Sequence, residues 1–158
     1  MEINKVEIIT FIIVFMIYSY IGASIEHIMY AIGEDKKTLE NIIITGFPLY
    51  GIGAYIVIFV NKYLKIYTDN IIIHCIIYGL LLSFLEYIVG KFIVGAGPDS
   101  YRDDGSIKSW DYSNKPFNFQ GIVTLMHLVS WGILGIFVSK LHPIIIDIVQ
   151  NGIKNIIN

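Results

Sequence analysis

Four long apolar stretches dominate the pattern of hydrophobic and polar positions along the chain. Each reaches the length of roughly 20 residues that a helix needs to cross a bilayer. Polar residues gather between the stretches, and the longest polar segment separates the third from the fourth. The pattern predicts an all-α, polytopic membrane helix bundle with transmembrane helices over residues 8–30, 42–62, 71–94 and 119–138.

The end of the chain shows a different pattern. Residues 141–158 are apolar but are interrupted by Asp147, Gln150 and Lys154. This spacing favours an amphipathic helix on the membrane surface over a fifth span. We therefore expect a transmembrane domain over residues 1–140, followed by an amphipathic tail over residues 141–158.

Composition points to the same class of protein. The 158 residues are 55% apolar and only 15% charged, and the mean hydropathy is +0.66. Soluble domains carry about 25% charged residues, and a small globule has a large surface to cover with them. The expected surroundings are therefore a lipid bilayer.

Several function classes are disfavoured by the sequence. A net charge of −2 without a basic stripe argues against nucleic-acid binding. The single cysteine, Cys75, leaves no disulfide within the chain. No Walker A motif is present, so no nucleotide-binding site is expected in this chain. No cofactor or metal is expected either, because the acids and histidines lack a ligand spacing such as H-E-x-x-H.

Two glutamates lie inside predicted membrane helices, where a carboxylate is costly and suggests function. Small residues mark the faces on which membrane helices pack, and each glutamate shares its face with such residues. These are Ser19 and Ala23 for Glu26, and Gly79, Ser83 and Gly90 for Glu86. Both carboxylates should therefore point into the bundle.

The two glutamates should also lie at similar depth. Each is near the C-terminal end of an odd-numbered helix, and such helices run in the same direction. The loop over residues 95–118 and a turn at residues 46–51 emerge on that membrane face, and His127 lies about two turns into the fourth helix. We expect one polar, substrate-binding pocket there, with its site residues Glu26, Glu86, Asp111, Tyr50, Asn118 and His127.

Structural roles explain some of these residues equally well. A glutamate near a helix end can cap neighbouring backbone, and a membrane histidine is more often a hydrogen-bonded packing residue. Trp110 and Tyr112 suit anchoring at the membrane interface. Asp111 between them either caps the loop or adds a third acid to the pocket.

The order of several short elements resembles the family called putative ABC-transporter type IV, which consists of small bacterial membrane proteins with eukaryotic relatives. The resemblance covers about residues 18–137, and its most specific part is the W-D-Y-S…P-F-N-x-x-G block. The elements are Gly22-x-x-x-Glu26, Gly46-Phe47-Pro48-Leu49-Tyr50-Gly51-Ile52-Gly53-Ala54, Leu85-Glu86-Tyr87, Trp110-Asp111-Tyr112-Ser113, Pro116-Phe117-Asn118 with Gly121, and Trp131-Gly132.

The chain departs from the family pattern at three places. The family tends to have an arginine where this chain has Thr45, and an arginine there would be a natural partner for an intramembrane acid. The family's Gly-Pro-rich turn is shortened here, and Ser109 replaces a second tryptophan before Trp110.

The resemblance implies a transporter or permease-like component. In that function, Glu26, Glu86 and Asp111 would bind a polar or cationic substrate or carry a proton. Two alternatives stay open: an intramembrane enzyme acting on a lipid headgroup, with a glutamate as general base, and a regulatory or assembly subunit. Four helices enclose little volume, so a transport path would need a homo-oligomer or a partner membrane subunit.

Overall fold

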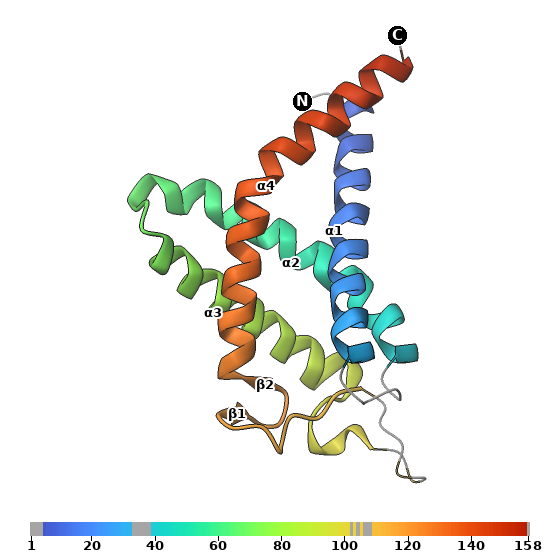
Figure 1. Cartoon of the computed structure of the whole chain (residues 1–158), viewed down its shortest axis with the longest axis vertical. Helices are drawn as coiled ribbons and strands as arrows, with labels where there is room; N and C mark the ends of the chain where they lie inside the picture. The colour runs from blue at the N-terminus through green and yellow to red at the C-terminus, as the bar shows by residue number, and fades with distance from the viewer. Residues whose placement is uncertain (1–4, 33–38, 102, 104, 106–108, 158) are drawn as a thin grey trace.

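The structure, a computed structural model, describes residues 5–32, 39–101, 103, 105 and 109–157, with side chains except those of residues 29–47 and 157. Four α-helices dominate this part of the chain (Figure 1): α1 (Lys5–Ile32), α2 (Leu39–Tyr67), α3 (Ile71–Val89) and α4 (Leu125–Ile157). Shorter elements lie between α3 and α4: the π-helical turn η2 (Gly90–Val94), the 3-10 turn η3 (Pro98–Ser100), and strands β1 (Asn118–Phe119) and β2 (Val123–Thr124). The predicted all-α helix bundle is confirmed.

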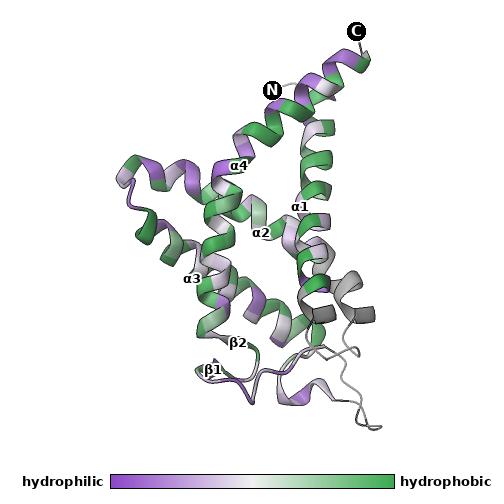
Figure 2. Ribbon diagram, in the orientation of Figure 1, coloured by the Kyte–Doolittle hydropathy of each residue, from purple (hydrophilic) through white to green (hydrophobic). Residues whose placement is uncertain are grey.

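Each of these α-helices, α3 together with the following η2, provides a segment long and apolar enough to cross a membrane. The segments are Lys5–Ile28, Pro48–Tyr67, Ile71–Val94 and Leu125–Ile156, with mean hydropathies from 1.3 to 2.2. Large apolar side chains such as Phe59 and Phe84 point outward and are more than 60% exposed. Figure 2 shows hydrophobic residues along most of the helices, while hydrophilic ones gather in the loop before α4 and near the helix ends. Such continuous apolar surface suits contact with lipid.

Helices α3 and α4 approach each other most closely where small residues face backbone. A Cβ added at Gly79 would collide with the carbonyl oxygen of Leu128, and one at Gly132 with the carbonyl oxygen of Cys75. Glycines permit this approach because they place no side chain between the helices. The small-residue face predicted for the third helix therefore contacts α4 at Gly79, whereas its Gly90 lies against Ile122 and Trp110, which precede α4.

The centre of the bundle joins three helices. Val57 of α2 and Tyr78 of α3 are completely buried, and they form one core cluster with Leu82 of α3. Trp131 and Val138 of α4 pack against this cluster. The core thus connects the α3–α4 pair to α2. Val57, Leu82, Trp131 and Val138 of this core also line a cavity between the helices.

Helix α4 differs from the prediction at both ends. It begins at Leu125 instead of residue 119, and it continues to Ile157 across the expected boundary at residue 140. Pro143 lies inside it, and the ribbon changes direction along this part of the helix (Figure 1). The C-terminal part packs Ile145 and Val149 against a cluster around Val14 of α1.

The start of α4 is delayed by a small hairpin. Strands β1 and β2 pair antiparallel, and Phe117 and Gln120 adopt positive φ angles of 52° and 54°. Positive φ is incompatible with a right-handed helix, although the apolar residues around Gln120, namely Phe119, Ile122 and Val123, resemble the start of one in the sequence. Thr124 then begins the helix, since its Oγ1 accepts from the backbone N–H of His127 at 3.2 Å.

Residues 46–51, predicted as a turn, are helical. They belong to α2, which contains Pro48 in its interior. A proline removes one backbone donor from a helix, and membrane helices tolerate this because neighbouring groups satisfy the freed carbonyl. Thr45 also lies in α2, but its side chain falls outside the described ones.

Candidate functional site

One cavity of about 830 Å³ opens among the four helices. This volume is within the range of small-molecule sites, about 300–1,000 Å³. Its walls come from α1, α2, α3, α4 and the loop at residues 110–115. The lining includes Tyr18, Gly22, Glu26, Tyr50, Val57, Leu82, Glu86, Trp110, Asp111, Lys115, Met126, His127, Trp131, Leu134 and Val138.

Glu26 is held by a residue of the next helix. The Tyr50 hydroxyl of α2 donates to Glu26 Oε2 at 2.7 Å. Gly22, one turn earlier on α1, lies directly against the Tyr50 ring, where a Cβ would collide with it. The Gly22-x-x-x-Glu26 spacing therefore places the glycine against the ring of Tyr50 and the glutamate beside its hydroxyl.

Glu86 is held in the same way by the other helix pair. The Trp131 indole N–H of α4 donates to Glu86 Oε2 at 2.8 Å. Glu86 is only 6% exposed, yet it lines the cavity. Within the described residues neither Glu86 nor Glu26 takes part in an ion pair. Both carboxylates are therefore fixed by neutral donors.

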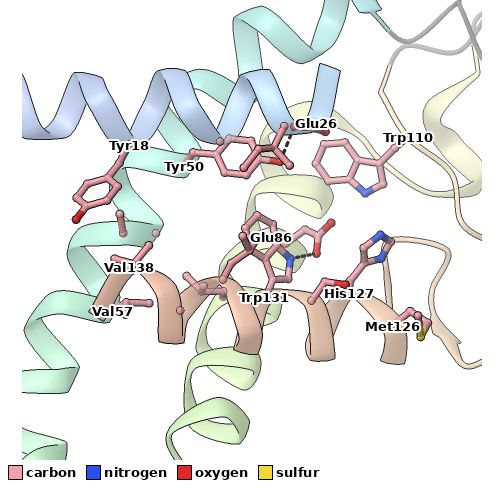
Figure 3. Close-up of a pocket in the computed structure, with 18 of the residues that line it drawn as sticks. Tyr18, Glu26, Tyr50, Val57, Glu86, Trp110, Met126, His127, Trp131 and Val138 are labelled. Atoms are coloured by element: carbon pink, nitrogen blue, oxygen red, sulfur yellow. Dashed lines mark hydrogen bonds between the residues drawn. The ribbon is translucent and has the colours of Figure 1, made fainter. Parts of the chain in front are cut away.

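The two anchoring rings connect the glutamates. The ring centroids of Tyr50 and Trp131 are 5.5 Å apart, with an interplanar angle of 43°. Figure 3 shows both hydrogen bonds beside this ring pair, which lies between Glu26 and Glu86. Sequence reasoning did not include Trp131 among the site residues. Its position four residues after His127, on the same helix face, was the available signal.

His127 lies in the first turn of α4, nearer the membrane face than the two turns predicted. Its Nδ1 is 3.0 Å from Thr124 Oγ1, and its ring lies 4.3 Å from that of Tyr112. Among the described side chains, no hydrogen bond joins His127 to an acid of the cavity. The arrangement resembles a packing histidine more than the partner of a catalytic base.

Asp111 lines the cavity and also shapes the loop. Its Oδ1 accepts from the backbone N–H and the hydroxyl of Ser113, at 2.9 and 2.6 Å. Gly121, at φ 66°, lies against the same oxygen, where a Cβ would collide. Both interpretations of Asp111 thus fit its position.

Asn118 is the predicted site residue that the structure places away from the cavity lining. Its amide donates to the carbonyl oxygens of Ser113 and Lys115, and its Oδ1 accepts from the N–H of Gly121. Trp110 ties the loop to the same hairpin through a 2.9 Å bond to the Ile122 carbonyl oxygen. The W-D-Y-S…P-F-N-x-x-G block therefore folds the loop that covers the cavity.

Polarity changes along the cavity. Glu26, Trp110 and His127 lie toward one end in Figure 3, while Val57 and Val138 lie toward the other. No group of three or more histidine, cysteine, aspartate or glutamate side chains in the described part of the chain could hold a metal ion.

Comparison with known proteins identifies the family. No solved structure matches the chain. The model of one family, described as putative ABC-transporter type IV, matches residues 13–158 and so includes all the cavity residues. With four apolar helices, this match indicates an ABC-transporter-related membrane protein. The chain belongs to the putative ABC-transporter type IV family.

Proposed function

We propose that this chain is the substrate-binding membrane component of a transport system, and that it binds a cationic group at Glu26 and Glu86. The observation that carries this proposal is the pair of glutamates, each fixed by a neutral ring donor, on the lining of one cavity. Neutral donors orient a carboxylate without cancelling its charge. A cationic ligand group would supply the positive counter-charge that these neutral donors do not provide.

Transport requires more than this chain. Residues of a single copy line the cavity, and we expect one copy to be enough for binding. Passage across the bilayer would need a second copy or a partner membrane subunit, and coupling to ATP would need a separate nucleotide-binding subunit. A binding role is favoured over an enzymatic one by His127, which bonds to Thr124 instead of a cavity acid.

Removing the charge of either glutamate should weaken cation binding. Glu26→Gln and Glu86→Gln keep the hydrogen-bond acceptor but remove the carboxylate. The probe, tetraethylammonium, has no N–H to donate, so a carboxylate attracts it through charge alone. Two opposite unit charges about 5 Å apart attract by about 3 kcal/mol at an effective dielectric constant of about 20. Desolvation offsets part of this attraction, so each variant should lower affinity by about 10- to 100-fold. Equilibrium binding of radiolabelled tetraethylammonium to protein in lipid nanodiscs measures this.

Asp147→Asn is the matched control. Asp147 is an exposed acid on α4, bonded to Asn151 and remote in sequence from the cavity lining. This variant should bind tetraethylammonium like the unmodified chain. The proposal is wrong if binding is not saturable, or if the two glutamine variants bind as well as the control.

A further inference from the structure

We propose that the cavity takes a single-chain amphiphile with a cationic head group, its head beside Glu26 and Glu86 and its chain along Val57, Leu134 and Val138. The inference rests on the proposed function and deepens it, because it names the class of substrate. The cavity's change of polarity, its extent along the helices and the charges at its polar end carry the argument.

The polarity of the cavity changes in one direction. At one end lie Glu26, Trp110 and His127, and the loop residues Asp111 and Lys115 complete that part of the lining. Val57 and Val138 lie at the opposite end (Figure 3). Leu82 forms a core cluster with Val57, and Leu134 is one helical turn before Val138 on α4, so aliphatic side chains of three helices line that end. The polar group there is the Tyr18 hydroxyl, which is 3.3 Å from His142 Nδ1. A ligand that is polar throughout would leave the aliphatic half poorly matched.

The cavity is elongated along the helices. On α4 its lining extends from Met126 to Val138, a rise of roughly 18 Å at 1.5 Å per residue. This is slightly more than half of the roughly 30 Å hydrocarbon core of a bilayer. His127 lies in the first turn of α4, so the polar end is at one face and the aliphatic end is near the middle. A lipid-like molecule in one leaflet has the same length and the same direction of polarity.

The charges favour a cationic head. Glu26 and Glu86 each use Oε2 for the tyrosine or tryptophan donor, and the described residues make no hydrogen bond to either Oε1. Glu86 is more than nine-tenths buried, so its carboxylate has little contact with water outside the cavity. Lys115 is the described cation on the lining, and it belongs to the exposed loop instead of the helices. An ammonium head would be attracted to both acids, whereas a sulfate or carboxylate head would be repelled.

The two tryptophans of the chain provide a direct test. Trp110 and Trp131 both line the cavity, so a bound molecule with bromine atoms in its chain should quench their fluorescence on contact. The probe is a dodecylammonium brominated at mid-chain, in proteoliposomes at a measured membrane mole fraction. The comparison probe is the dodecyl sulfate brominated in the same way. We expect saturable quenching by the ammonium probe and only weak, non-saturable quenching by the sulfate.

Two pairs of variants localise the binding. Leu134→Phe fills the aliphatic end of the cavity, and its control is Ile133→Phe, at the neighbouring outward-facing position, where Ile133 is 48% exposed. Glu86→Gln removes charge at the polar end, and its control is Asp147→Asn. The saturable quenching should disappear in Leu134→Phe and Glu86→Gln and persist in both controls. Tetraethylammonium has no chain, so Leu134→Phe should still bind it, which also shows that this variant is folded.

The outcomes separate this inference from the proposal beneath it. If tetraethylammonium binds but the ammonium probe gives no saturable quenching, the proposal of an amphiphilic ligand is wrong and the proposal of a cation site stands. Equal saturable quenching by the sulfate probe would show that the site does not require a cationic head group. If neither tetraethylammonium nor the ammonium probe binds, both proposals fail.

Discussion

Gly132→Leu is expected to prevent the bundle from folding. Gly132 of α4 lies against the backbone of Cys75 on α3, and any side chain there meets the Cys75 carbonyl oxygen. Overpacking by one or two methylenes costs about 1–3 kcal/mol, so Gly132→Ala should already be destabilised by this amount. Leucine would force the two helices apart, with loss of the folded protein. Size-exclusion chromatography after mild detergent extraction, followed by thermal unfolding, measures both effects.

Gly152→Ala is the control for helix composition. It lies on the same helix, and no atom is within 4 Å of an added Cβ. Alanine is favoured over glycine in a helix by up to about 1 kcal/mol, so this variant should be as stable as the unmodified chain or more so. If Gly132→Leu also remained monodisperse with an unchanged unfolding midpoint, the close α3–α4 contact would be wrong.

Trp131→Phe is expected to destabilise the protein by about 2–3 kcal/mol and to abolish cation binding. It removes the indole donor from Glu86 Oε2. Glu86 is 6% exposed, and a buried polar group that loses its partner costs about 1–3 kcal/mol, more when it is charged. It also replaces the indole ring that contacts Tyr50 with a smaller phenyl ring, so the ring pair between the two glutamates loses part of its contact. Unfolding in mixed micelles measures the stability, and tetraethylammonium binding measures the site.

A double-mutant cycle assigns the cause of that loss. Trp131→Phe combined with Glu86→Leu removes both partners, so no carboxylate is left without its donor. Residues in contact typically couple by about 0.5–3 kcal/mol, and the double variant should therefore lose less stability than the sum of the two single variants. Additive losses would mean that the Trp131–Glu86 hydrogen bond contributes nothing.

The helices could be predicted because each one is encoded by a long uninterrupted apolar run. The errors occur where local backbone chemistry overrides hydropathy. Residues 119–124 are apolar enough to extend α4, but Gln120 at positive φ turns the chain into a hairpin. Pro48 and its neighbouring glycines resemble a turn, yet α2 continues through them. These choices depend on contacts with other helices, which a single sequence does not contain.

The candidate site was predictable to the extent that burial of an acid in a membrane helix is unusual. Glu26 and Glu86 stand out for that reason, and shared helix direction is enough to place them at similar depth. The donors were harder to assign, because Trp131 and Glu86 are 45 residues apart in the chain. The P-F-N-x-x-G motif predicts a site role for Asn118, but its side chain closes the loop through hydrogen bonds and does not line the cavity. That these residues bind a substrate stays a prediction.

The contact between α1 and the end of α4 has a consequence for biosynthesis. Ribosomes deliver α1 to the membrane well before α4, yet Tyr18 of α1 meets His142 of α4, and Val14 packs in a cluster with Ile145 and Val149. Until α4 is inserted, Glu86 also lacks the indole of Trp131. Before α4 is inserted, the nascent chain therefore exposes the α1 surface that α4 later covers and carries a glutamate in the bilayer without its hydrogen-bond donor. A membrane chaperone or insertase would bind the chain at that stage.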